Sequence, residues 1–182
     1  MKYVQPIRDL DKLEEIKKIL KRESYRNYFL FILGINTGLR ISDILKLKVA
    51  DVKSKSHIII KEEKTDKNKR FKINLVLQNE IEEYTDGLNP SDYLFPSRNG
   101  SNSKPITRFM AYNILNRAAK KVGIDEIGTH TLRKTFGYHF YQKTKDVAML
   151  QELFNHSAPS VTLRYIGINQ DMMDEAIDSF SL

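Results

Sequence analysis

Cysteine is absent from the 182 residues. Its absence excludes disulfides, thiolate chemistry and zinc sites built on sulfur, and it favours a reducing compartment. Long hydrophobic runs are also missing, because the longest, 28–35, is far too short to cross a bilayer and residues 1–6 lack the apolar stretch of a secretion signal. We therefore predict a cytoplasmic protein. With no internal repeat, low-complexity stretch or linker, the chain is predicted to be a single domain over 1–182.

Basic residues are unevenly distributed along the chain. Lys and Arg outnumber Asp and Glu by 30 to 23, which gives a formal net charge of +7. Residues 44–75 carry a net charge of +6 and 98–145 a net of +8, whereas 76–97 and 146–182 each carry −5. Such blocks indicate that one face of the fold meets a polyanion. Charge alone favours nucleic acid only slightly, since solvated lysine-rich loops also occur on proteins that never bind DNA.

Apolar spacing predicts a mainly helical chain. A first helix follows Asp11, which with Glu14 resembles a capping box, and a buried helix covers 25–37, with Gly38 just after its end. A short helix is predicted over 40–47. Further helices are predicted over 76–86, 107–122, 131–143, 146–154, 159–166 and 171–180.

Residues 57–75 change to a two-residue period. Their apolar residues fall on either side of a polar turn at 66–68, namely Ile58, Ile59 and Ile60 before it and Phe71, Ile73 and Leu75 after it. This pattern predicts a β-hairpin with a lysine-rich tip. The elements together predict an α+β fold, mainly helical, with one small antiparallel sheet.

Arginine, aspartate and histidine recur at positions that share a helix face. Arg40 opens a helix just after a tight turn, and Asp43 lies three residues later on the same face. His130 and Arg133 occupy positions i and i+3 of another helix. Each pair taken alone is as typical of a surface contact or of chance spacing, and surface ion pairs contribute little.

Three further residues complete the set. His156 lies in a break between two predicted helices, and Tyr165 follows nine residues later, where an ordinary half-buried aromatic is equally common. Lys64 lies on the predicted hairpin, where any single basic residue could be a solvated edge charge. Its basic neighbours there are Lys61, Lys67, Lys69, Arg70 and Lys72.

Six of these residues, without Asp43, resemble the tyrosine recombinase family, the phage integrases and their relatives, in their order and spacing. The six are Arg40, Lys64, His130, Arg133, His156 and Tyr165. The similarity runs from about Asp11 to Gly167 and is carried by 36–45 (NTGLRISDIL), 130–136 (HTLRKTF) and 150–165. The resemblance implies a catalytic domain that cuts and rejoins double-stranded DNA through a 3′-phosphotyrosyl intermediate, in integration, excision or inversion. It implies no metal and no other cofactor.

The resemblance also assigns the catalytic roles, and the residue types suit them. A phosphodiester under attack gains negative charge on its non-bridging oxygens. Arg40 and Arg133 offer planar forks that match those oxygens, with His156 as a further donor. Tyr165 is the implied nucleophile, and its phenol, with an ordinary pKa of about 10, needs a base. His130 is the candidate base, because an imidazole titrates near neutrality.

The remaining roles surround this centre. Lys64 is assigned as the general acid for the leaving 5′-hydroxyl, although a slightly long hairpin turn allows Lys61 or Lys67 to take its place. Asp43 is expected to orient Arg40. Contacts to the DNA are expected from Lys67, Lys69, Arg70 and Lys134.

The sequence departs from the family pattern in two places. It begins almost directly at the catalytic domain, without the helical core-binding domain that commonly comes first in the family. Phe154-Asn155-His156 replaces the more usual Leu-Gly-His, and Asn155 is expected to adopt the left-handed backbone conformation that glycine would supply.

The predicted last helix, 171–180, is acidic on one face and apolar on the other. Packing within the chain and packing on a neighbouring protomer are equally consistent with this pattern. The resemblance implies a homotetramer on synapsed DNA. We predict a monomer when the protein is free, because weak apolar contacts between protomers need DNA to raise the local concentration.

Other functions stay open alongside strand exchange. One is a DNA-binding regulator with the same fold but no turnover, which the competent residues at all six reactive positions disfavour. Another is a nicking and closing enzyme of the type IB topoisomerase kind. A metal nuclease is disfavoured, because Glu80, Glu82 and Glu83 lie beside no histidine and are predicted to form a solvated helix face.

Overall fold

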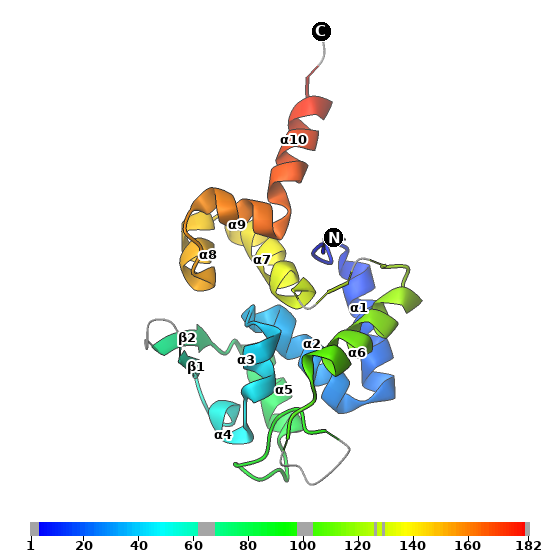
Figure 1. Ribbon diagram of the computed structural model, residues 1–182, viewed down its shortest axis with the longest axis vertical. Helices are drawn as coiled ribbons and strands as arrows, with labels where there is room; N and C mark the ends of the chain where they lie inside the picture. The colour runs from blue at the N-terminus through cyan, green and yellow to red at the C-terminus, as the bar shows by residue number, and fades with distance from the viewer. Residues whose placement is uncertain (1–3, 62–67, 98–103, 126, 129, 181–182) are drawn as a thin grey trace.

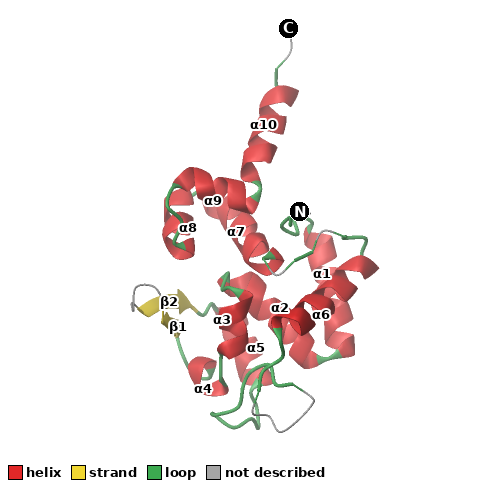
Figure 2. Cartoon of the chain, in the orientation of Figure 1, coloured by secondary structure: helices red, strands yellow, loops and turns green. Residues whose placement is uncertain are grey.

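Helices dominate the structure, a computed structural model that describes residues 4–61, 68–97, 104–125, 127–128 and 130–180. In chain order they are α1 (Leu10–Glu23), α2 (Tyr25–Thr37), α3 (Ile41–Lys46), α4 (Val49–Val52), α5 (Leu75–Tyr84), α6 (Arg108–Lys121), α7 (Thr131–Thr144), α8 (Val147–Phe154), α9 (Pro159–Ile166) and α10 (Ile168–Asp178). Strands β1 (His57–Lys61) and β2 (Asn68–Lys72) form an antiparallel pair, with Ile58 opposite Phe71. The predicted α+β fold is confirmed (Figure 1, Figure 2).

Helix α2 forms the centre of the core. Its residues 28–34 are all buried, since this segment is apolar on every side, and α1, α3, α5 and α7 pack around it. A second, smaller apolar cluster joins α8, α9 and the start of α10. Helix α7 belongs to both, because Leu132 packs in the larger cluster and Phe136 against the smaller one. The two clusters therefore meet along α7.

Most predicted helices lie where the periodicity placed them, but two begin earlier. The N-cap of α1 is Asp9 and not Asp11, because the Asp9 carboxylate accepts hydrogen bonds from the backbone N–H groups of Asp11 and Lys12. Helix α10 begins at Ile168 and not at 171, directly after Gly167 ends α9 in a left-handed conformation. Ile168 is buried, which anchors the first turn of α10.

The segment after the hairpin also differs from the prediction. Leu75 was expected in the second strand, but it is the first residue of α5 and 73% exposed. The cause is Asn74, whose side chain accepts a hydrogen bond from the backbone N–H of Leu77 at 2.8 Å and so starts a helix. Helix α4 was not predicted, since four residues are too few to show a period. Of the predicted turn at 66–68, Asn68 belongs to β2 and the rest lies outside the described residues.

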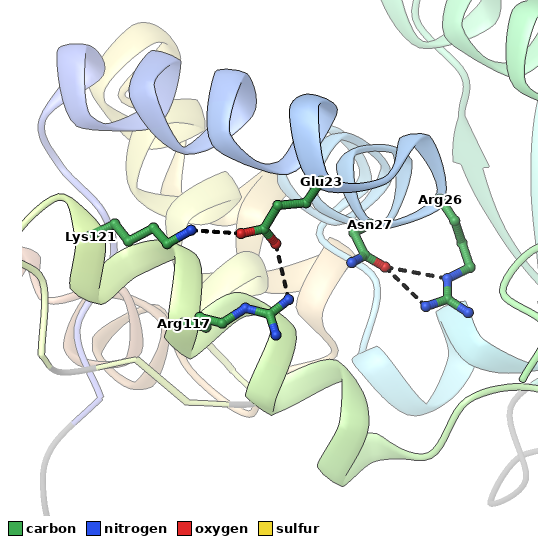
Figure 3. Close-up of polar contacts among 5 residues, drawn as sticks. All are labelled: Glu23, Arg26, Asn27, Arg117 and Lys121. Carbon is green, nitrogen blue, oxygen red and sulfur yellow. Dashed lines mark hydrogen bonds and ion pairs between the residues drawn. The ribbon is translucent and has the colours of Figure 1, made fainter. Parts of the chain in front are cut away.

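An ion-pair cluster ties the end of α1 to α6 (Figure 3). The Glu23 carboxylate accepts hydrogen bonds from Lys121 Nζ at 2.8 Å and from Arg117 Nη2 at 3.0 Å. These contacts hold the pKa of Glu23 below its ordinary value. Beside them, Arg26 donates to Asn27 Oδ1 and to the carbonyl of Pro96. The cluster is largely exposed, so it orients α6 more than it stabilises the fold.

Of the three glutamates of α5, Glu82 and Glu83 are exposed as predicted, whereas Glu80 is partly buried. Glu80 accepts hydrogen bonds from the hydroxyls of Tyr25 at 3.0 Å and Tyr28 at 2.7 Å, so its carboxylate links α5 to the buried helix α2. Glu82 accepts one from the backbone N–H of Ser54.

In the ranges that the structure describes, no helix combines the length and the hydropathy needed to span a membrane.

Gly38 gives a sharp test of packing at the end of α2. Its φ is +65°, and an added Cβ would lie 2.4 Å from Cδ1 of Phe136. Gly87 has φ +71° with nothing within 4 Å of an added Cβ, so it is a matched control. We expect Gly87→Ala to lower the free energy of unfolding by about 1–2 kcal/mol, the cost of the left-handed conformation, and Gly38→Ala by about 2–5 kcal/mol through added overpacking. Denaturant titration measures both, and equal losses would contradict the clash with Phe136.

Candidate active site

A small pocket lies where α3, the hairpin, the first turn of α7 and the end of α8 meet. Arg40 and Arg133, which are far apart in the sequence, line the same pocket. Its other lining residues are Asp43, Ile60, Lys69, Phe71, Leu153, Phe154 and Asn155. Three of the lining side chains are cationic and one is acidic, so the pocket suits an anion.

Arg133 is held in the pocket by burial and by two hydrogen bonds. Its side chain is buried, with Nη1 donating to the carbonyl of Gly38 at 2.6 Å and Nη2 donating to the carbonyl of Phe154 at 3.0 Å. The guanidinium carbon lies 4.0 Å from the centre of the Phe154 ring. Burial lowers the pKa of Arg133 to about 10, which leaves it charged at neutral pH. Contacts from α2 and α8 thus fix a buried positive charge.

Arg40 lines the pocket from the start of α3. It is the N-cap residue of α3, extended at φ −67° and ψ 143°, and its side chain is exposed. Asp43 follows in the first turn of α3, and its charge raises the pKa of Arg133 while that of Arg40 lowers it. The field of Asp43 therefore acts on Arg133, a coupling that was not predicted.

Tyr165 lies beside both predicted histidines. His130, just before α7, places Nδ1 3.1 Å from Oη of Tyr165, with the two rings edge to face. His156, in the turn between α8 and α9, has its ring centre 5.1 Å from that of Tyr165. The Nδ1 atom of His156 is 3.0 Å from the hydroxyl of the buried Thr162, which orients this imidazole and was not foreseen.

Burial and charge set the protonation of these rings. Burial raises the pKa of Tyr165, whereas the charges of Arg133 and Arg40 lower it. Burial lowers the pKa of His130 and of His156, and nearby cations lower both further. Both imidazoles are therefore neutral near pH 7. A neutral ring at hydrogen-bonding distance can accept the phenol proton.

Asn155 adopts the left-handed conformation expected of it, with φ 56° and ψ 45°. It is the C-cap of α8, and its backbone N–H donates to the carbonyl of Glu152. The turn brings the carbonyl of Phe154 to Arg133 and the ring of His156 to Tyr165. The exchange of glycine for asparagine thus leaves the turn intact.

The hairpin presents its basic residues in different directions. Lys69 lines the pocket, and its Nζ donates to the carbonyl of Glu152 at 2.6 Å, which links β2 to the end of α8. Arg70 is exposed, and its Nη2 lies 3.4 Å from Nδ1 of His57 on the paired strand. Lys61 is also exposed. Two other predicted residues of this group, Lys64 and Lys67, lie outside the described residues.

Lys134 is turned into the protein, unlike the DNA-facing side chain that was predicted. It is 7% exposed, its Nζ donates to the carbonyl of Val4 at 2.8 Å, and it lies 5.0 Å from the centre of the Tyr165 ring. A direct DNA contact therefore requires its ammonium to leave Val4. Lysines are rarely buried, so sequence offers little signal for this location.

Comparisons with known proteins identify relatives of the chain. The model of the phage integrase family matches residues 9–172. The probable integrase/recombinase YoeC of Bacillus subtilis (strain 168) is 53% identical over 180 residues, which is 99% of this chain and 98% of that protein. The tyrosine recombinase XerA of Pyrococcus horikoshii is 29% identical over 172 residues, 93% of this chain but only 60% of that protein.

Solved structures share the fold. The crystal structure of XerA recombinase superposes with a TM-score of 0.74 at 21% identity, covering 94% of this chain and 64% of that one. XerH site-specific recombinase, in a post-cleavage complex with its palindromic difH substrate, gives a TM-score of 0.72 at 22% identity, covering 97% of this chain and 54% of that one. With a family model matched over nearly its whole length and a relative matched from end to end, the chain belongs to the phage integrase family, the tyrosine recombinases, which are enzymes that cleave and rejoin DNA without a metal.

Proposed function

We propose that this chain carries out site-specific DNA strand exchange in the pocket between α3, the hairpin, α7 and α8. The observation that carries the proposal is the 3.1 Å approach of His130 Nδ1 to the Tyr165 hydroxyl, beside the buried charge of Arg133. A phenol next to a neutral base and a fixed guanidinium is equipped to attack a phosphodiester.

The covalent step conserves its atoms and charges. The Tyr165 oxygen bonds to the phosphorus and passes its proton to His130, while the bond from phosphorus to the 5′ oxygen breaks. That oxygen takes up a proton from the general acid, assigned to Lys64, and leaves as a free 5′-hydroxyl. The phosphotyrosyl ester retains the energy of the broken linkage, so attack by a hydroxyl from a second duplex exchanges strands and needs no cofactor.

The phosphate ligands differ in how they are held. The guanidinium of Arg133 has five N–H donors, and two of them bind the carbonyls of Gly38 and Phe154. One of the remaining donors interacts with Tyr165, and the others are proposed to bind oxygens of the phosphate. Arg40 is exposed and reaches the phosphate from solvent, with His156 as a third donor. Arg133 is thus preorganised and Arg40 is ordered by the DNA.

The other assignments concern the hairpin and α3. Lys64 is proposed as the general acid that protonates the leaving oxygen, with Lys61 and Lys67 as its alternatives. Asp43 orients Arg40 and supports the charge of Arg133. Lys67, Lys69 and Arg70 contact the DNA backbone, and Lys69 does so after releasing the carbonyl of Glu152.

Helix α10 suits contact between protomers. It projects from the body of the molecule in Figure 1, and its apolar residues are exposed, with Met172 at 52% and Ile177 at 69%. Phe180, just beyond the helix, is 69% exposed. We assign this stripe to packing on a neighbouring protomer within a tetramer on synapsed DNA, and we expect a monomer when no DNA is bound.

Because the substrate is DNA, we propose that the protein acts in the cytoplasm. We also propose that this chain forms one catalytic domain.

The test is covalent capture of DNA in the presence of a chelator. The Tyr165→Phe protein first selects its preferred duplex from a random 40-base-pair library. Copies of that duplex, each nicked at a different position, are then incubated with the wild-type protein and EDTA. An adduct that survives denaturation is expected where the nick lets the short 5′-hydroxyl strand diffuse away. Tight selective binding with no adduct at any nick would favour the regulator.

The pH dependence of this reaction follows from the lowered pKa of His130. We expect the rate of adduct formation to be constant at neutral pH and to fall only below about 6.5, the ordinary value for histidine. The free energy of unfolding should fall with pH in the same direction. His130 in the unfolded chain binds a proton at a higher pH than in the folded protein, so stability is lost as the pH falls from about 6.5 through the folded pKa. Single-turnover rates and melting temperatures from pH 5 to 8 measure both. A midpoint above 6.5 would contradict the neutral base, and His130→Asn should be slow at every pH.

A further inference from the structure

The residues before α1, 4–8, belong to no helix or strand, and hydrogen bonds hold them against α7. The backbone N–H of Ile7 donates to the hydroxyl of Thr135 at 2.9 Å, and the carbonyl of Ile7 lies 2.9 Å from Nε2 of His139. An added Cβ on Gly128, just before α7, would lie 2.5 Å from Cγ2 of Val4. The segment is therefore closely packed and bonded at several points, and we call residues 4–8 the N-terminal strap.

The N-terminal strap reaches the end of α9, the helix that carries Tyr165, through Arg8. Its Nη2 donates to the carbonyl of Gly167 at 3.2 Å, and its Nη1 pairs with Oδ1 of Asp171 at 2.5 Å. The guanidinium carbon lies 5.3 Å from the centre of the Tyr138 ring on α7. One side chain thus joins α7 to the junction of α9 and α10.

That junction lies two residues after Tyr165. Gly167 ends α9 and starts α10 at φ +82°, and an added Cβ there would lie 2.9 Å from Nη2 of Arg8. Helix α10 has most of its length exposed and projects from the body, so any tilt of α10 acts on the last turn of α9 (Figure 1). The buried side chains of Ile166 and Ile168 hold this turn in the small apolar cluster, and Arg8 holds it through the carbonyl of Gly167.

We infer that Arg8 is a positioning residue, which fixes the end of α9 so that the Tyr165 hydroxyl stays within reach of His130. The inference rests on the proposed role of Tyr165 as nucleophile. Displacing a reacting group by about 1 Å costs on the order of 100-fold in rate, even when the displaced group remains in the site. Lys134 adds a second link, because it joins Val4 of the strap to the face of the Tyr165 ring.

The experiment compares Arg8→Ala with Lys17→Ala. Lys17 pairs with Glu14 within α1, so its loss removes an ion pair that involves neither the strap nor α9. On the selected nicked duplex we expect Arg8→Ala to slow adduct formation by about 10–100-fold, with unchanged affinity for the intact duplex. Lys17→Ala should match the wild type, and Arg8→Lys should recover part of the rate because an ammonium can still reach one acceptor. Equal rates for Arg8→Ala and Lys17→Ala would overturn the inference.

A measurement without DNA separates this inference from the proposed function. In protein carrying 13C at the tyrosine ζ carbons, the Tyr165 signal is identified by its loss in Tyr165→Phe. We expect this signal to shift as His130 titrates in the wild type and to lose that shift in Arg8→Ala. An unchanged titration in Arg8→Ala would refute the positioning role whether or not the wild type forms an adduct. Absence of any wild-type adduct would refute the proposed function instead.

Discussion

Tyr165→Phe should abolish covalent capture of DNA while leaving the protein folded and able to bind the same duplex. The substitution removes only the hydroxyl oxygen, and the ring that packs against Phe154 and His156 remains. Without a nucleophile no ester can form, so we expect the adduct rate to fall by at least about 10⁴-fold, as for loss of other catalytic nucleophiles. Denaturing electrophoresis of the nicked-duplex reaction measures the adduct, and filter binding measures the affinity, which should change less than about twofold.

Tyr112→Phe is the matched control. Tyr112 lies on α6, where its hydroxyl accepts a hydrogen bond from Asn116 four residues later, outside the pocket. This variant should form the adduct at the wild-type rate. An adduct that persists in Tyr165→Phe would remove Tyr165 from its role, and sequencing of the DNA-linked peptide would then identify the residue that attacks.

Arg133→Ala should give the second largest loss. A preorganised cation that stabilises charge in a phosphoryl-transfer transition state is worth about 10³–10⁵ in rate. DNA binding should persist with nearly the same salt dependence, because one phosphate contact among many is removed. We therefore expect single-turnover cleavage to fall at least about 10³-fold while the dissociation constant changes only a few-fold.

Arg133 also supports the fold, so its variants need a stability measurement. Its loss leaves the carbonyls of Gly38 and Phe154 without their donor, at about 1–3 kcal/mol for each buried group. Arg133→Lys retains a charge but cannot bind both carbonyls and a phosphate in one plane, and it should also cleave slowly. Arg117→Ala, which loses only an exposed ion pair with Glu23, should alter neither property. Wild-type cleavage by a folded Arg133→Lys protein would contradict the need for the planar fork.

The sequence predicts the elements with a regular period and the residues with a distinctive order. Helix α2 is apolar on all sides and ends at a glycine, so its bounds follow from residue type alone. Arg40 and Arg133 are brought to one pocket as their order implied. The hydrogen bonds that hold Arg133 do not follow in the same way, because they come from backbone carbonyls, and every residue has one.

Other features escape sequence reasoning for different reasons. The strap lacks a period because it belongs to no helix or strand, so its bonds to α7 and α10 depend on tertiary packing alone. Leu75 continued an alternating pattern, yet the local cap formed by Asn74 outweighed it. Lys134 is buried because Val4 supplies an acceptor from a distant part of the chain. In each case the partner is remote in sequence or is backbone.

The division of the interior into two apolar clusters has a consequence for how activity can be lost. Arg40 is built on the larger body through α3, whereas Tyr165 and His156 are attached to the smaller one through α8 and α9. Arg133 lies at the boundary between the two clusters, which we call the seam. It bonds the carbonyl of Gly38 at the end of α2 and the carbonyl of Phe154 at the end of α8. A slight slippage along this seam would separate nucleophile from phosphate ligand without unfolding either body. An inactive variant that retains its full helical content is therefore an expected outcome, and folding assays alone would not distinguish it from the wild type.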